Sequence, residues 1–132
     1  MIIGIECTAH TFGCGIVNKG KILANVKDSF TTQSGGIIPI DAALHHKNCA
    51  NIVWENALRI SKINEENINA IAFSNAPGLA PCLVEGRKFV ILQSQRLKIP
   101  IIPVNHCVAH LEIGKITGAK YPVLLYASGA NT

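Results

Sequence analysis

The class of the fold follows from residues 1–30, MIIGIECTAHTFGCGIVNKGKILANVKDSF. This segment contains three short runs of β-branched and other apolar residues, the composition of strands. The mostly polar segment TAHTF (residues 8–12) separates the first two runs, and NKGK (residues 18–21) separates the second from the third. Short polar breaks of this kind join neighbouring strands, so the segment predicts a three-stranded antiparallel meander.

A long helix is predicted after the meander. Apolar side chains recur at helical spacing in residues 41–62, with Asp41 as the N-cap and Pro39 suited to a helix start. The apolar residues of this stripe are Leu44, Ile52, Val53, Ala57 and Ile60. His45 and His46 also lie on this helix, where adjacent side chains point about 100° apart. We therefore assign them to structure or to a subunit contact, since together they cannot easily bind one ion.

Strands and helices alternate in the rest of the chain. Strands are expected at residues 69–74, 99–104 and 121–127, and helices at about 82–97 and 106–115. The order is β-β-β-α-β-α-β-α-β. It predicts an α/β domain of the ribonuclease-H-like kind, in which helices cover both faces of a mixed, mainly parallel sheet.

The composition is that of one domain with a large apolar core. The chain has 132 residues, of which 48% are hydrophobic and 15% charged, and its net charge is +4. No segment reaches the roughly 18 apolar residues of a membrane helix, and Glu6 within the apolar start argues against a signal peptide. Five cysteines without a CxxC pair predict a reduced, cytoplasmic protein. The weak positive charge permits contact with RNA but does not predict it.

Two histidines form the main candidate site. His106 and His110 are four residues apart, so on a helix they share one face and can reach one cation. They also follow a predicted parallel strand, where α/β sheets gather ligands. Two packed imidazoles remain the alternative, because this spacing also arises by chance. Cys107 stands where a zinc protease would carry its glutamate, so the general base of a protease is missing.

Residues near the carboxyl terminus complete the candidate site. Tyr126 ends a predicted strand and is a candidate third ligand, and a phenolate beside imidazoles suits iron better than a structural zinc. The turn SGANT (residues 128–132) offers backbone amides that can hold a phosphate, as does the hairpin around Thr8. Plain turns are the alternative at both places. Because this last strand and turn would normally open a hairpin, the chain reads as the front half of a longer protein.

Five segments together resemble one known family. They are GIECTAHTFGCGIV, GGIIPIDAALHH, IAFSNAPGLAPCL, PIIPVNHCVAHLEIGK and LLYASGANT. In their order and spacing the chain resembles the TsaD-type tRNA threonylcarbamoyladenosine transferases, also labelled O-sialoglycoprotein endopeptidases. It is most similar to their archaeal and eukaryotic branch, which works in the KEOPS complex. The block NHxxxHxEIG at residues 105–114 is the most specific part of a likeness that spans essentially the whole chain.

The resemblance implies an actin-like, two-lobed fold of the sugar-kinase and heat-shock ATPase superfamily. Residues 1–121 would form the amino-terminal lobe, and residues 122–132 the first strand and substrate loop that lead into a second lobe, which this chain lacks. The implied activity is transfer of threonylcarbamoyl from its adenylate to N6 of the adenosine beside the tRNA anticodon. The implied setting is cytoplasmic and away from membranes, with tRNA and KEOPS-type subunits, including an atypical kinase, as partners.

The resemblance also implies a metal and a nucleotide site. His106, His110 and Tyr126 would hold one divalent ion, iron or zinc, together with an aspartate of the second lobe. This ion would act as a Lewis acid, and no residue is assigned a direct catalytic role. An adenine nucleotide or the threonylcarbamoyl-adenylate would contact residues of the first hairpin and of the last loop. These residues are Thr8, Tyr126, Ala127, Ser128, Gly129, Ala130 and Asn131.

Some positions depart from the family pattern and leave other functions open. Ala130 and Ala76 stand at glycine positions, and His10 stands where some members carry an acidic residue. One alternative is a metal-dependent O-sialoglycoprotein endopeptidase-type hydrolase, and another is a non-catalytic scaffold that associates with itself through exposed apolar surface. We expect the 132 residues alone to be inactive, because half of the nucleotide site and one metal ligand belong to the second lobe.

Overall fold

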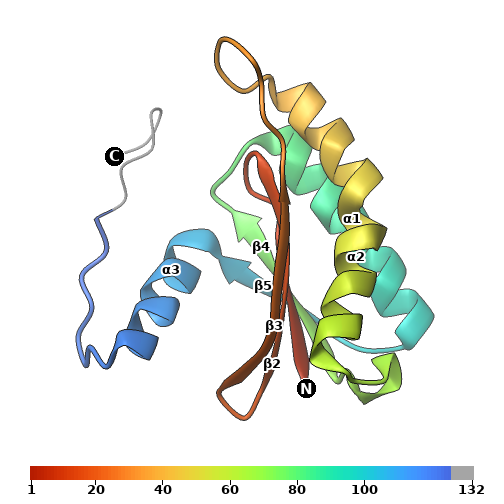
Figure 1. The fold of residues 1–132 in the computed structure, drawn as a ribbon, viewed down its shortest axis with the longest axis vertical. Coiled ribbons are helices and arrows are strands. Elements are labelled where there is room, and N and C mark those ends of the chain that lie inside the picture. Colours follow the sequence, from red (N-terminus) through yellow and green to blue (C-terminus); the bar gives the residue numbers. More distant parts are fainter. Residues whose placement is uncertain (126–132) are drawn as a thin grey trace.

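The computed structural model describes residues 1–125 and contains one five-stranded mixed sheet (Figure 1). In the sheet the strands follow the order β3-β2-β1-β4-β5. The first three strands pair antiparallel, whereas β1, β4 and β5 run parallel. The predicted meander and mixed sheet are therefore confirmed. The strands are β1 (Ile2–Glu6), β2 (Thr11–Asn18), β3 (Lys21–Ser29), β4 (Ala70–Ala76) and β5 (Ile101–Asn105).

Helices lie on both faces of this sheet, as predicted. Figure 1 shows α1 (Pro39–Ser61) and α2 (Ala80–Leu97) side by side on one face, and α3 (His106–Gly114) on the other. Two short 3-10 helices, η1 (Glu65–Asn67) and η2 (Lys115–Thr117), follow α1 and α3. Within residues 1–125, none of the helices has the length and apolar character required to cross a membrane.

The core lies between the sheet and the pair α1 and α2. Alternation along β1 sends Ile3 and Ile5 into this core and leaves Gly4 and Glu6 on the face toward α3. Aromatic side chains then fill the space under the helices. Phe89 of α2 packs edge-on against Phe12 of β2 and Trp54 of α1. The alternation fixes which side chains are available to a site on the α3 face.

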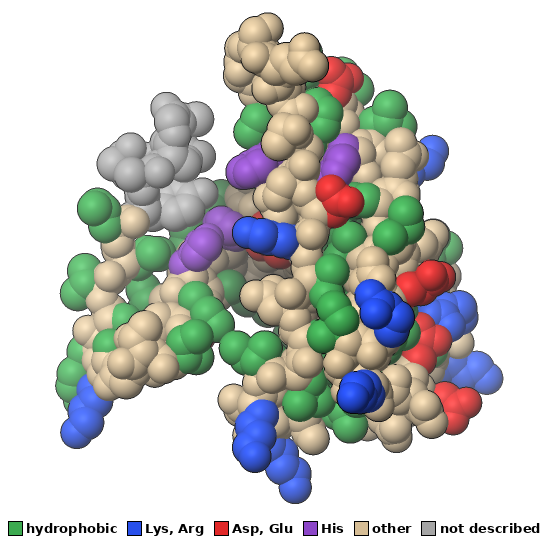
Figure 2. All heavy atoms as spheres, in the orientation of Figure 1, with side chains coloured by type: hydrophobic (Ala, Val, Ile, Leu, Met, Phe, Trp, Pro, Cys, Tyr) green, Lys and Arg blue, Asp and Glu red, His purple; other side chains and the backbone are tan. Residues whose placement is uncertain are grey.

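The face of the sheet toward α3 is hollow. Gly4, Gly13 and Gly15 lie on this face, so the sheet presents little side-chain volume there. Figure 2 shows the molecule hollowed between α3 and the sheet, with apolar side chains on both sides. The hollow has a volume of about 710 Å³, and Val108 and Ile113 of α3 line its outer wall.

Helix α1 starts earlier than the sequence predicts. It begins at Pro39 with Ile38 as the N-cap, so Asp41 lies in the first turn and does not cap the helix. Proline suits the first helical position because φ is already fixed there and the missing N–H would have had no acceptor. The acidic side chain of Asp41 is still well placed, since carboxylates stabilise the positive end of the helix dipole.

The buried face of α1 also differs from the predicted stripe. Val53 and Ala57 are buried, but Leu44, Ile52 and Ile60 are exposed. The inward face is made largely of small residues, which let α1 approach the sheet and α2 closely. The buried residues are Ala42, Ala43, His46, Cys49, Ala50, Val53, Trp54 and Ala57.

The last predicted strand is not formed over its described part. Residues 121–125 have no strand structure, and Tyr121, Val123 and Leu125 are exposed. A strand needs a neighbour for its backbone hydrogen bonds, and no strand within residues 1–125 pairs with this segment. The rest of the prediction, Tyr126 and Ala127, lies outside the described residues.

Two glycines bring α2 and the loop before it against the end of β1. A side chain at Gly86 would overlap the side chain of Cys7, and a Cβ at Gly78 would lie 2.6 Å from the carbonyl oxygen of Thr8. The amide of Leu79 donates to the same oxygen at 2.7 Å. The loop therefore holds Thr8 in place next to the candidate site.

Candidate metal centre

Three parallel strands end at the same edge of the sheet and supply the candidate site. Glu6 ends β1, Ser74 lies near the end of β4, and His106 directly follows β5. Because neighbouring parallel strands present their carboxyl ends together, residues far apart in sequence meet at this edge. A hollow of about 390 Å³ opens at this edge, and its lining residues are Glu6, Thr8, Ala9, His10, Thr11, His106, Ala109 and His110.

The start of α3 is fixed by a side-chain cap. The Oδ1 atom of Asn105 accepts hydrogen bonds from the backbone amides of Cys107 at 2.9 Å and Val108 at 3.2 Å. This cap satisfies two amides that the first turn would leave without partners. It sets the first turn so that His106 and His110 lie one above the other on the face toward the hollow.

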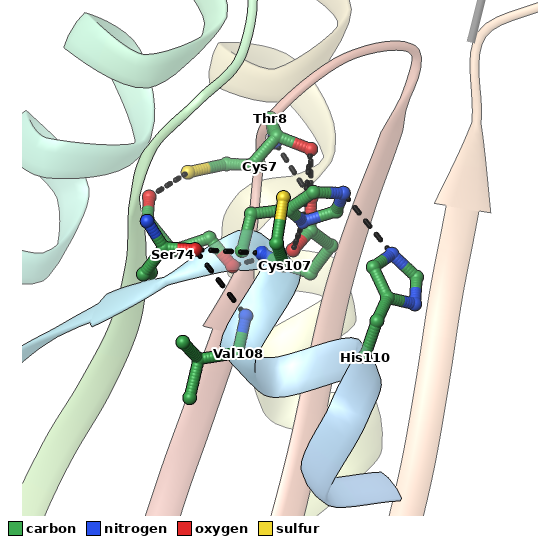
Figure 3. A network of polar contacts seen from close by, with 9 residues as sticks. Cys7, Thr8, Ser74, Cys107, Val108 and His110 are labelled. Atoms are coloured by element: carbon green, nitrogen blue, oxygen red, sulfur yellow. Dashed lines mark hydrogen bonds and ion pairs between the residues drawn. The ribbon is translucent and has the colours of Figure 1, made fainter. Parts of the chain in front are cut away.

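The two predicted histidine ligands are brought together. Their Nε2 atoms are 3.0 Å apart, and the rings meet edge to face with centroids 4.4 Å apart. Figure 3 shows His110 directed at the neighbouring imidazole from the next turn of α3. The side chain of His106 is only 12% exposed, whereas His110 is exposed, so the pair runs from the inner part of the hollow to the surface.

Glu6 orients the imidazole of His106. Its Oε2 atom lies 3.1 Å from Nδ1 of His106 and accepts a hydrogen bond of 2.5 Å from the hydroxyl of Ser74. Its Oε1 atom accepts from the backbone amide of Thr8 at 2.8 Å and from the Thr8 hydroxyl. The Thr8 hydroxyl is also 3.4 Å from Nδ1 of His106. One carboxylate thus joins β1, β4 and α3.

The charge of Glu6 decides the tautomer of His106. Burial would raise the pKa of Glu6, but the hydrogen bonds from Ser74 and Thr8, with His106 nearby, together leave the pKa below its ordinary value. The carboxylate is therefore ionised at neutral pH and can only accept hydrogen bonds. Nδ1 of His106 must then carry the hydrogen. The lone pair of a neutral His106 is left on Nε2, which faces His110.

This arrangement fits a divalent metal ion. Metal–nitrogen bonds of about 2.0–2.1 Å place two tetrahedral imidazole ligands roughly 3.3 Å apart, close to the observed 3.0 Å between the Nε2 atoms. A carboxylate behind a ligating imidazole is also the usual way in which proteins fix such a ligand and raise its basicity. His106 and His110 are therefore suited to hold one ion, with Glu6 as a positioning residue.

Glu6 and Ser74 are the residues of the candidate site that the sequence interpretation missed. A signal for Glu6 was present, because a charged residue at the end of an otherwise apolar strand needs a partner. No comparable signal marked Ser74, whose role depends on the register between β1 and β4.

The other predicted site residues divide into two groups. Thr8 lies beside His106 at the candidate site, as described above. Tyr126 and residues 127–131 lie outside the described residues.

The two histidines of α1 are not part of this site. His45 and His46 point in different directions, as expected: His46 is buried against Phe12, and His45 faces β3. The five cysteines are free, and four of them are buried.

Related proteins share one family description. Residues 21–132 match the family model TsaD: tRNA N6-adenosine threonylcarbamoyltransferase. The chain is 47% identical over 137 residues to the tRNA N6-adenosine threonylcarbamoyltransferase of Staphylothermus marinus, and 48% identical over 134 residues to that of Thermococcus gammatolerans. Each match covers 98% of this chain and 40% of the relative. The chain thus spans about two fifths of the length of these relatives.

Further similarities concern a fused protein and a solved structure. The chain is 43% identical over 133 residues to a probable bifunctional tRNA threonylcarbamoyladenosine biosynthesis protein of Thermoplasma volcanium, covering all of this chain and 25% of that protein. The structure of YeaZ from Pseudomonas aeruginosa matches with a TM-score of 0.69 and 12% identity, over 90% of this chain and 50% of that chain. The latter likeness concerns the fold alone, which is the predicted ribonuclease-H-like, actin-like α/β lobe. By its sequence match, the chain belongs to the TsaD family of tRNA N6-adenosine threonylcarbamoyltransferases.

Proposed function

We propose that this chain forms the metal-holding lobe of an enzyme that modifies tRNA. The reaction is transfer of threonylcarbamoyl from threonylcarbamoyl-adenylate to N6 of the adenosine beside the anticodon. The observation that carries the proposal is the pair His106 and His110, whose Nε2 atoms face each other 3.0 Å apart while Glu6 holds one ring from behind. The reaction is inferred from membership of the family, and the histidine pair offers ligands for a metal ion that would assist it.

His106 and His110 would hold the ion, with Tyr126 as a further ligand. When bound, a divalent ion such as iron or zinc supplies Lewis-acid stabilisation of the carbamoyl carbonyl or the adenylate phosphate. Glu6 keeps the hydrogen of His106 on Nδ1, so that Nε2 stays available as a ligand. The first hairpin, held at Thr8 by the loop of Gly78, forms one wall of the hollow in which the substrate would lie.

The partners would meet different parts of the surface. The adenylate would bind at the edge of the sheet where the three parallel strands end, and the resemblance to the family assigns residues 126–131 to the same ligand. The exposed apolar residues Leu44, Ile52 and Ile60 support contact with protein, either a KEOPS-type subunit or another copy. The tRNA would reach the hollow from its open side, and the net charge of +4 permits contact with a polyanion.

The test is a transfer assay with a metal measurement on the same samples. Protein from the complete reading frame is incubated with threonylcarbamoyl-adenylate and a tRNA transcript, and the digested nucleosides are analysed by mass spectrometry. We expect modified adenosine with the wild type, loss of product and of bound metal with His106→Ala, and retention of both with Lys115→Gln. Lys115 is a fair control because it is exposed just after the same helix and lies outside the block of residues 105–114.

Two results would contradict the proposal. If a His106→Ala protein that binds no metal transfers at the wild-type rate, the metal is not needed for the reaction. If the metal-loaded wild type transfers nothing to tRNA when all subunits of the complex are supplied, the proposed reaction is wrong. The 132 residues alone are expected to be inactive in this assay.

A further inference from the structure

A second cluster of ligand-type side chains lies on the other side of the molecule from α3, between β3 and α1. Asp28 is on β3, and His45 and Cys49 are one turn apart on α1. Side chains four residues apart share one helix face, and here that face is turned to the end of β3. The interaction of His45 with Asp28 shows that the two elements already meet at this point.

The distances within this cluster are close to those of a metal site. Nε2 of His45 lies 3.1 Å from Oδ1 of Asp28, and Nδ1 of His45 lies 3.8 Å from Sγ of Cys49. These two contacts use different ring nitrogens, and an ion binds only one of them, but one ligand atom from each residue can be chosen so that all three lie within 4.8 Å of one another. Zinc bonds of about 2.0–2.3 Å require such atoms to be roughly 3.3–3.6 Å apart. Asp28 is half exposed, so its side chain has room to change rotamer and approach a bound ion.

We propose that Asp28, His45 and Cys49 form a second metal site, which takes Zn²⁺ or a metal of similar preference. Thiolate, imidazole and carboxylate are the three ligand types that zinc uses, and three protein ligands leave one position open. The open position faces a hollow of about 490 Å³, which Asp41 and Asn48 also line. A bound ion would join the end of β3 to α1. This proposal does not depend on the proposed function of the histidine pair on α3.

The surroundings of Cys49 favour a cation in this place. Cys49 is buried, and its burial, with the carboxylate of Asp28 nearby, raises the pKa of its thiol to about 11. The thiol therefore has little tendency to ionise alone, which argues against a nucleophilic cysteine activated by His45. A divalent ion changes this balance, because the thiolate and the carboxylate together neutralise its two charges. Phe30 packs against the ring of His45 and limits its rotation.

Cobalt provides a direct readout of the thiolate ligand. The purified protein, freed of metal, is titrated with Co²⁺, which occupies tetrahedral zinc sites and gives a charge-transfer band in the near ultraviolet only when a thiolate is bound. We expect a band that saturates in the wild type, by two equivalents because the histidine pair on α3 also takes an ion, and loss of the band in Cys49→Ser. Cys107→Ser is the matched control and should keep the band, although Cys107 lies next to His106.

Asp28→Asn gives a second readout that does not depend on a buried substitution. Asp28 is half exposed, so the variant should fold, and its circular dichroism checks this. We expect its Kd for Co²⁺ at the thiolate band to rise at least about tenfold, the smallest loss seen even when an outer-shell partner is removed. Zn²⁺ should raise the Tm of the wild type by more than that of Asp28→Asn. Absence of the band in the wild type, its survival in Cys49→Ser, or an unchanged Kd in Asp28→Asn would overturn the proposal.

Discussion

Replacing Glu6 by glutamine tests how the metal pair on α3 is held. The substitution keeps the shape of the side chain and removes its charge. The backbone amide of Thr8 is a fixed donor to Oε1, so the oxygen of the new amide must stay there. Its NH₂ group then takes the place of Oε2, which lies 3.1 Å from Nδ1 of His106. A donor now faces the ring nitrogen that donates in the native protein.

The expected effect is a loss of metal affinity. His106 can accept from the new donor only by moving its hydrogen to Nε2, which then no longer offers a lone pair to an ion. Loss of a carboxylate behind a ligating histidine typically costs 10–100-fold in metal affinity, or about 1.4–2.7 kcal/mol. We expect Glu6→Gln to lie in this range, because Oε2 is the only carboxylate atom in hydrogen-bond contact with His106 among the described residues.

The assay is metal titration in competition with a chelator, at one fixed pH. Lys115→Gln, which changes an exposed charge just after the same helix, should stay within about twofold of the wild type, as expected for an exposed ion pair. Circular dichroism of each variant shows whether the fold is retained. If folded Glu6→Gln binds metal as tightly as the wild type, the tautomer argument is wrong and Glu6 is only a structural link between β1 and β4.

Three further outcomes concern stability. Gly86→Ala should lower the free energy of unfolding by roughly 1–3 kcal/mol in urea titration, since the added methyl overlaps the Cys7 side chain, and unchanged stability would refute this close approach. Glu65→Gln should lower the free energy of unfolding by about 1 kcal/mol, because Glu65 accepts two hydrogen bonds from Arg96 that lower its pKa. This contribution is present above the unfolded pKa of about 4.5 and is lost as the pH falls through the folded pKa. The variant should therefore lack this decrease of stability in acid. Burial lowers the pKa of His46, so below about pH 6.5 the unfolded chain binds a proton at this residue that the folded chain does not. The free energy of unfolding should therefore decrease as the pH is lowered through this range. If the same dependence on pH persists in His46→Leu, another group causes it.

The order of strands and long helices up to α3 was predictable from the sequence because each has its own local signal. Polar breaks mark the meander, and helical spacing marks α1, α2 and α3. The buried face of α1 was less predictable, since this helix is apolar on two sides. Large residues such as Leu44 and Ile52 lie outside, while alanines face the sheet. Hydrophobicity alone ranks the large residues as core, but close packing between elements selects the small ones.

The candidate site was predictable only where its residues are close in sequence. His106 and His110 share one helix, so their spacing was enough to bring them together. Glu6 reaches His106 through the pairing of β1 with β4 and of β4 with β5, and no local pattern contains that register. The cluster of Asp28, His45 and Cys49 was missed for the same reason, because it needs the packing of α1 on β3.

The junction at Glu6 also has a consequence for folding kinetics. Ser74 is 68 residues from Glu6 along the chain, and His106 is 100 residues from it. Contacts of such separation carry a large loop-closure cost and tend to form after local structure. The histidine pair would therefore be oriented only after β1, β4 and β5 have paired in register. During refolding, uptake of metal by this pair would lag behind the formation of α1 and α2 and would mark the chains whose parallel strands are complete.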